Sequence, residues 1–190
     1  QVVSGLALTL FGSGLSDYLG KAYVGMRAEH TFGKLPIPGL SDIPIIGPVV
    51  FKQDILVYIS YVLVAATAFY LYKTRAGLFL RALGENPAAV DSVGINVFRL
   101  RYFYVMIGGA LAGLGGAYLS LAYAPSWLEN MTAGRGWIAV ALVIFAIWDP
   151  WRALAGSYLF GGVDALGFHL QVIGLPISIF ILNMLPYIFT

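Results

Sequence analysis

The sequence has no cysteine and very few charged residues. Cysteine is absent from its 190 residues, and Asp, Glu, Lys and Arg together make up 11% of them. Without cysteine there is no disulfide framework and no thiolate chemistry. A typical globular domain carries about 25% charged residues, and a soluble chain with far fewer would expose large apolar patches. The low charge therefore argues against a soluble domain.

Sequence motifs for catalysis are also missing. There is no Gly-x-x-x-x-Gly-Lys-Ser/Thr, no Gly-x-Ser-x-Gly, no His-Glu-x-x-His and no clustered pair of acids. The two histidines, His30 and His169, lie far apart and indicate no metal site. The 11 basic residues form no block, so nucleic acid is not an expected partner. We therefore predict that the chain is not an enzyme and holds no cofactor or metal.

Apolar residues dominate what is present. The chain is 59% hydrophobic and has a mean hydropathy of +0.83. Its apolar runs do not alternate with polar residues, which disfavours a membrane barrel. The predicted fold class is all-α, a polytopic bundle of transmembrane helices with about five to six membrane segments.

Two apolar runs are long enough to cross a bilayer. Residues 55–72 are uncharged and would span about 27 Å as a helix. Residues 102–128 also contain no charge, and they carry small residues every fourth position in two adjacent rows. Such a face suits close contact with another helix, which we favour, or a position beside a transport pathway.

The other apolar stretches are shorter. Residues 1–16 are interpreted as the remaining part of a membrane helix, and 172–190 as a last apolar stretch. Residues 137–148 and 153–168 are each short for a 30 Å core. They are either a re-entrant pair or two spans, and Asp164 interrupts the second.

Two segments between the apolar runs are predicted to be loops. Residues 17–52 contain a cluster of Pro and Gly that cannot continue a helix. Residues 124–136 form the second loop. Four polar residues in loops or apolar runs are candidates for a translocation pathway: Glu129, Asn130, Asp164 and Asn183. The alternatives are solvated loop positions for the first two, a membrane face for Asp164 and a bond to a neighbouring helix for Asn183.

Residues 73–96 carry charge and a full set of helix signals between two apolar runs. Asn86 can cap a helix, and Pro87 suits its first position. Gly94 can end it in a left-handed conformation. The pattern predicts a short helix from Pro87 to Val93, which is too short to persist alone and so must dock against something.

This segment resembles the cytoplasmic coupling loop of bacterial ABC-transporter permeases that import branched-chain amino acids, simple sugars and nucleosides. The resemblance lies in Thr74-Arg75-Ala76-Gly77-Leu78, Arg81-Ala82-Leu83-Gly84-Glu85-Asn86-Pro87-Ala88-Ala89 and Gly94-Ile95. A second family pattern is Glu129-Asn130-Met131-Thr132-Ala133-Gly134-Arg135-Gly136-Trp137. The apolar loop at 35–48 resembles that of the nucleoside-type members.

The resemblance implies a permease subunit that forms half of a translocation pathway for nucleosides. Simple sugars or branched-chain amino acids are alternative substrates, and a secondary transporter or channel without an ATPase is a third possibility. The residues implied to couple with the ATPase are Arg81, Gly84, Glu85, Asn86, Pro87, Ala88, Ala89, Asp91 and Gly94. ATP would be used by the partner subunit.

The implied setting is the bacterial cytoplasmic (inner) membrane, with several spans in the lipid bilayer. Implied protein partners are an ABC ATPase subunit, a second permease subunit, identical or different, and an extracytoplasmic substrate-binding protein. Because family members are longer, we expect residues 1–190 to be a single permease domain truncated at both ends. Five basic residues near the ends of two spans favour a cytoplasmic side for 73–101. Alternation then puts 17–52 and 124–136 outside.

Overall fold

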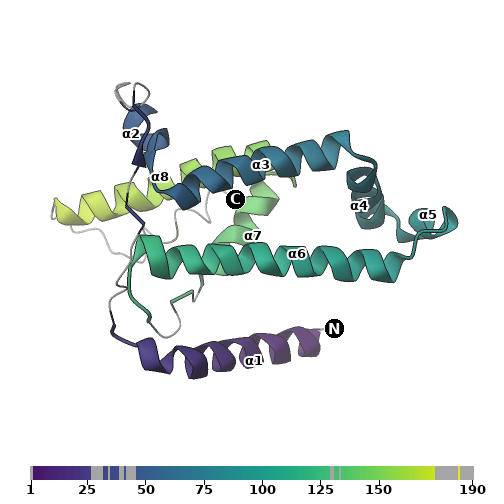
Figure 1. Cartoon of the computed structure of the whole chain (residues 1–190), viewed down its shortest axis with the longest axis horizontal. Coiled ribbons are helices and arrows are strands. Elements are labelled where there is room, and N and C mark those ends of the chain that lie inside the picture. The colour runs from purple at the N-terminus through teal and green to yellow at the C-terminus, as the bar shows by residue number, and fades with distance from the viewer. Residues whose placement is uncertain are drawn as a thin grey trace. The chain divides into compact units, whose positions relative to one another are not determined.

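The computed structural model is built almost entirely from helices (Figure 1). It describes residues 2–26, 32–33, 35–38, 41, 46–128, 131–132, 134–173 and 184. The longer helices are α1 (Val2–Gly20), α3 (Ile55–Lys73), α4 (Arg75–Glu85), α6 (Val97–Tyr118), α7 (Arg135–Phe145) and α8 (Pro150–Val172). The shorter elements are η1 (Lys21–Tyr23), α2 (Ile46–Val50), α5 (Pro87–Ser92), the π-helical turn η2 (Leu119–Tyr123) and strands β1 (Leu35–Pro36) and β2 (Lys52–Gln53). The predicted helical class is confirmed.

Two helices are long and apolar enough to cross a membrane. They are α3 and the continuous helical stretch Val97–Tyr123, formed by α6 and η2. In α3, only 6% of the most apolar stretch is buried among the described residues. In Val97–Tyr123, none of the corresponding stretch is buried among them. The core helix of a soluble protein would be covered, so these surfaces need lipid or other helices around them. The predicted span at 55–72 agrees with α3. The second begins at Val97, where the Asn96 side chain accepts the Arg99 N–H and caps the helix.

The loop predicted at 17–52 was wrong at its start and incomplete inside. Helix α1 continues through Asp17 to Gly20, since no proline interrupts it there. Within the segment, β1 and β2 pair antiparallel, and α2 adds one short helix. The strand pair also positions Tyr58, whose hydroxyl donates to the Leu35 carbonyl oxygen at 2.9 Å.

The stretch 137–168 holds one short and one long helix. Helix α7 has 11 residues, close to the prediction, whereas α8 runs for 23 residues. The prediction of a second short segment interrupted by Asp164 was therefore wrong. Asp164 is exposed on α8, so its charge is no reason for the helix to stop. The number of membrane segments stays a prediction, and 174–183 and 185–190 in the last predicted stretch lie outside the described residues.

The chain divides into two compact units. Unit 1 comprises Gln1–Tyr58 and Phe103–Ala133, and unit 2 comprises Ile59–Tyr102 and Gly134–Thr190. The single permease domain expected for 1–190 stays a prediction. Among the described residues, the buried apolar side chains all belong to unit 2: Ala68, Leu83, Val90, Ala141, Ala146 and Phe160.

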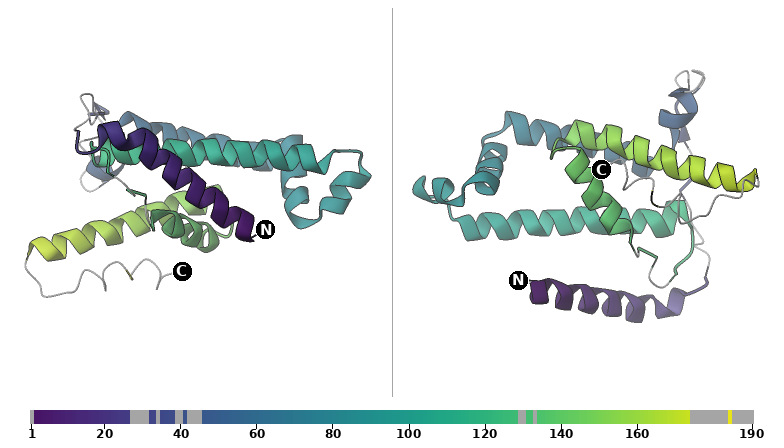
Figure 2. Two further views of the ribbon diagram at one scale, coloured as in Figure 1. Left: turned by 90° about the horizontal axis from the view of Figure 1, so that it is seen from below. Right: turned by 180° about the vertical axis from the view of Figure 1, so that it is seen from behind.

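Helices α7 and α8 pack together inside unit 2 (Figure 2). Gly156 of α8 allows this approach, because a Cβ there would lie 2.7 Å from Cδ1 of Leu142. Phe145 and Phe160 meet edge to face with ring centroids 6.0 Å apart. The hydroxyls of Tyr61 and Tyr158 hydrogen-bond, which attaches α3 to α8.

Candidate functional site

The start of α4 is formed by a tight turn at Thr74. Its side-chain oxygen accepts the Gly77 N–H at 3.0 Å, and its hydroxyl donates to the Tyr70 carbonyl oxygen at 2.6 Å. A Cβ on Gly77 would overlap that same carbonyl oxygen and would lie 2.7 Å from the Leu71 Cα. The chain can therefore turn directly from α3 into α4 only because residue 77 has no side chain.

Asn86 ends α4 and begins α5. Its backbone N–H donates to the Ala82 carbonyl oxygen at 2.8 Å, and its side-chain oxygen accepts the Ala88 N–H at 3.1 Å. Pro87 takes the first position of α5, and Gly94 has a φ of +81°. The short helix predicted from Pro87 to Val93 is confirmed, with its last residue at Ser92.

Each helix of this pair has one buried apolar side chain. Leu83 of α4 is 7% exposed and Val90 of α5 is 2% exposed. Helices α4 and α5 pack against each other after α3 (Figure 1). Of the residues predicted for ATPase coupling, Pro87 is half-buried and the others are exposed: Arg81, Gly84, Glu85, Asn86, Ala88, Ala89, Asp91 and Gly94. The structure thus places the predicted coupling residues on α4 and α5, between them or just after them, and leaves most of them exposed.

The structure also connects this region to α8. The Tyr72 hydroxyl, near the end of α3, donates to Asp149 Oδ2 at 2.8 Å. The other Asp149 oxygen accepts the Arg152 N–H at 2.9 Å and so caps α8. The Arg81 guanidinium of α4 lies over the Tyr72 ring, 5.3 Å from its centroid. Tyr72 therefore contacts both α4 and the cap of α8.

Two of these contacts lower the pKa of the Asp149 carboxyl. The Arg152 N–H, and after it the Tyr72 hydroxyl, hold the pKa of Asp149 below its ordinary value of 3.8. Both groups donate to the charged carboxylate, which favours the ionised form. Sequence reasoning missed Tyr72 and Asp149. The pair Asp149-Pro150 carries the same cap-then-proline signal as Asn86-Pro87 and could have marked the start of α8.

The turn before Asp149 has an unusual backbone. Ile147 and Trp148 have φ angles of 52° and 59°, in the left-handed region. The Trp148 N–H donates to the Val143 carbonyl oxygen at 3.3 Å, which closes the end of α7 in the manner of a Schellman motif. Glycine is the usual residue at such a position, so a β-branched side chain there stores strain.

The predicted pathway residues are not brought together by the structure. Asp164 lies exposed on α8. Glu129, Asn130 and Asn183 lie outside the described residues. Their role in a pathway stays a prediction.

A protein-family model described as the branched-chain amino acid transport system permease component matches residues 1–185. A protein of Haloferax volcanii, provisionally assigned as a glucose ABC transporter permease, is 43% identical over 184 residues, which are 94% of this chain and 55% of that protein. A guanosine ABC transporter permease of Bacillus subtilis is 35% identical over all of this chain and 62% of its own length. A nucleoside ABC transporter permease of Lactococcus lactis is 37% identical over all of this chain and 62% of its own length.

The chain thus spans 55% to 62% of the length of these relatives. No solved structure matches it. These relatives are named as permeases, which agrees with the prediction of a transporter component and not an enzyme. The resemblance of residues 73–96 to the coupling loop pointed to the same group of proteins. This chain belongs to the family of ABC-transporter permease components that includes the branched-chain amino acid transport permeases.

Proposed function

We propose that this chain is the membrane-embedded permease of an ABC importer and forms half of a translocation pathway. Helices α4 and α5 would be the element that docks on a separate ATPase subunit. The observation that carries this proposal is the pair itself, which lies between two membrane-length helices, is anchored by Leu83 and Val90, and keeps most predicted coupling residues exposed. A plain connector needs no such anchored surface.

The contacts of this pair supply a route for mechanical coupling. A shift of α5 would move α4 through Leu83 and Val90. It would reach α3 through the Thr74 turn. It would reach α8 through Tyr72 and Asp149. Packed helices respond to such a displacement as rigid bodies, so nucleotide-driven motion of the ATPase would switch the pathway between outward and inward access.

Basic residues support a cytoplasmic position for this end of α3, α4 and α8. The group comprises Lys73, Arg75, Arg81, Arg99, Arg101 and, through the Asp149 cap, Arg152. Lys and Arg near the ends of membrane helices favour the cytoplasmic side. The proposal therefore includes a multi-pass protein of the bacterial inner membrane, with 17–52 and 124–136 outside.

The complete importer would contain more than this chain. An ATPase subunit would bind and hydrolyse ATP, and a second permease subunit would complete the pathway. A binding protein outside the membrane would deliver the substrate to the outer loops. We propose a nucleoside as the substrate, in keeping with the names of two relatives. A simple sugar is the second candidate, because the relative with 43% identity is assigned to glucose.

Coupling through α4 and α5 can be tested with the full-length permease co-expressed with its ATPase. The variant Glu85→Ala/Asn86→Ala removes one exposed charge and the α5 cap. We expect loss of ATPase co-purification, or loss of substrate-stimulated ATP hydrolysis, with normal insertion into the membrane. Losing such a cap costs about 1 kcal/mol locally, which is enough to disorder a short helix without unfolding the protein.

The matched control is Lys21→Ala, an exposed residue of η1 outside the coupling helices. It should assemble and hydrolyse ATP as the wild type does. If the double variant also couples normally, α4 and α5 form an ordinary connector and the coupling proposal fails. Substrate uptake that proceeds without any ATPase would instead indicate a secondary transporter.

A further inference from the structure

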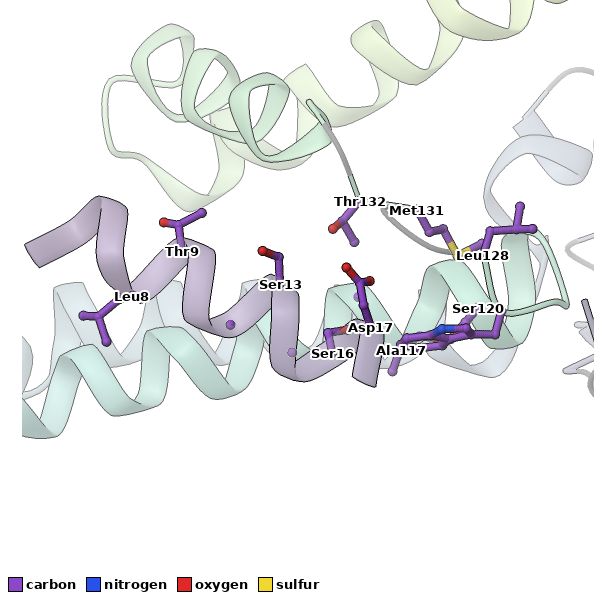
Figure 3. Close-up of a pocket in the computed structure, with 14 residues that line it drawn as sticks. Leu8, Thr9, Ser13, Ser16, Asp17, Ala117, Ser120, Leu128, Met131 and Thr132 are labelled. Carbon is purple, nitrogen blue, oxygen red and sulfur yellow. The ribbon is translucent and has the colours of Figure 1, made fainter. Parts of the chain in front are cut away.

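Unit 1 contains a pocket of about 600 Å³ (Figure 3). It is lined by α1, by the last turns of α6 with η2, and by Trp127, Leu128, Met131 and Thr132. Its volume falls in the range of ligand sites, which is roughly 300–1,000 Å³. None of the predicted coupling residues lines it, nor does Asp164, and the other predicted pathway residues lie outside the described part of the chain. The small-residue face of 102–128, for which a position beside a transport pathway was the alternative, contributes Gly113, Gly116 and Ala117 to this pocket.

Three polar side chains form one row on the α1 wall. Thr9, Ser13 and Asp17 are spaced by four residues, so they share a helix face, and Figure 3 shows their oxygen atoms along one side of α1. Asp17 is half-buried, whereas its helix neighbours Ser16 and Tyr18 are exposed. Its carboxylate has no hydrogen-bond or ion-pair partner among the residues that the structure describes. An unpaired acid at such a position in a membrane protein is a functional candidate by default.

Three of the hydroxyl groups that line the pocket offer acceptor oxygens. The Thr9 hydroxyl donates to the Gly5 carbonyl at 2.9 Å, and the Ser13 hydroxyl donates to the Leu10 carbonyl at 3.1 Å. On the opposite wall, the Ser120 hydroxyl donates to the Ala117 carbonyl at 3.2 Å. Each hydroxyl thereby uses its proton within its own helix and keeps lone pairs for a ligand. Together with the Asp17 carboxylate, they make the pocket rich in acceptors.

The indole ring of Trp127 forms another part of the wall. The indole Nε1 of Trp127 is buried and has no hydrogen-bond partner within the described part of the chain. The ring lies against Gly20, where any Cβ would overlap it, so its position depends on that glycine. Other lining residues are apolar, among them Leu8, Leu128 and Met131. An aromatic and apolar wall with a few polar groups suits a ring-shaped ligand.

We propose that this pocket binds the hydroxylated ring of a neutral solute, either a sugar or the ribose of a nucleoside. Asp17, Thr9 and Ser13 accept hydrogen bonds from the ligand hydroxyls, and the Trp127 side of the pocket covers the ring. An acceptor-rich wall repels a carboxylate or phosphate, so the pocket disfavours anions and the carboxylate end of an amino acid. This inference rests on the proposed importer function and names the substrate class of its membrane part.

The absence of cysteine from this chain makes a direct test possible. In the assembled importer, with any cysteines elsewhere replaced, Thr9→Cys and Ser13→Cys each place one thiol in the pocket. Ser4→Cys is the matched control, because it is exposed on the same helix and does not line the pocket. The measurement is the rate of labelling by a small maleimide in the presence of glucose, guanosine, leucine or putrescine.

We expect glucose or guanosine to slow labelling of Thr9→Cys and Ser13→Cys but not of Ser4→Cys. At about ten times the dissociation constant, the rate should fall about tenfold, because only roughly a tenth of the sites stay empty. Adding Asp17→Asn should raise the concentration needed for half-protection by about ten- to hundredfold, the usual effect of losing a hydrogen bond to a charged group. Protection by glucose and not guanosine would assign the ring to a sugar, and the reverse to a nucleoside.

Three results would overturn the proposal: no protection by either compound, stronger protection by leucine or putrescine, or no labelling of the pocket thiols. ATP-dependent uptake of glucose and guanosine by the unmodified importer is measured first. Uptake without protection would reject the pocket and leave the importer function standing. If neither ATPase binding nor uptake is found, the proposed function itself fails.

Discussion

The two units of this protein differ in how their described residues are held in place. Unit 2 contains all the buried apolar side chains found among the described residues, together with side-chain caps at the starts of α4, α5 and α8. In unit 1, Asp54 is buried with one carboxylate oxygen unpaired, and the α6 glycines 108, 109, 113, 115 and 116 have no described neighbour where a Cβ would be. Unit 2 thus has a small apolar core of its own, although α3 also needs cover, whereas unit 1 has no buried apolar side chain among its described residues.

That contrast suits a transporter, because a coupling element must be stiff and a binding surface must be open. The tight helix packing that we favoured for the small residues of 102–128 is absent among the described residues. Instead, Gly113, Gly116 and Ala117 line the pocket. The contrast between the two units can be tested by substitutions at glycines of each unit, at Asp149 and at Ile147 in the left-handed turn.

The largest effect is expected at Gly77. Gly77→Ala forces the backbone at Tyr70 and Leu71 to move, and such overpacking costs about 1–3 kcal/mol. The matched control is Gly109→Ala on α6, where nothing lies within 4 Å of the new Cβ among the described residues. It should be neutral or stabilising by up to about 1 kcal/mol. Thermal unfolding of the detergent-purified permease measures both variants, and equal melting temperatures would refute the contrast between the units.

A smaller, pH-dependent effect is expected at Asp149. Its pKa is lowered in the folded protein, so its stabilising contribution is complete above about pH 4, the ordinary carboxyl value, and is lost as the pH falls through the lower folded value. Asp149→Asn should therefore lower the melting temperature at neutral pH and converge with the wild type in strong acid. Tyr72→Phe removes one of the two hydrogen-bond donors to Asp149. It should therefore lower the melting temperature at neutral pH by a smaller amount and also converge with the wild type in strong acid. A difference that stays constant across this pH range would contradict the assigned hydrogen bonds.

The smallest effect is expected at the turn between α7 and α8. Ile147→Gly should raise stability slightly, by less than about 1 kcal/mol, because relief of left-handed strain outweighs the added freedom of glycine in the unfolded chain. Ile147 is 67% exposed, so little packing is lost. Val140→Gly, at an exposed position inside α7, should destabilise by about 1 kcal/mol. A destabilised Ile147→Gly would show that the turn depends on the side chain.

Local sequence signals predicted the short helix α5 well, whereas α4 was not predicted as a separate helix. Asn86, Pro87 and Gly94 act on their immediate neighbours, so their effect can be read without a tertiary structure. The length of α8 was predicted poorly, since Asp164 looked like an interruption. A single charge ends a helix only if it must be buried, and burial is not a local property.

By itself the sequence determined the helical membrane character, the two long spans and the capped segment between them, because hydropathy and capping act over a few residues. The tertiary structure decided which distant residues meet. It brought Tyr72 into hydrogen-bonding distance of Asp149 and packed the Trp127 ring against Gly20. It also placed Thr9, Ser13 and Asp17 in one pocket with Ser120. Such contacts depend on how helices far apart in the chain pack, and neither composition nor periodicity records that packing.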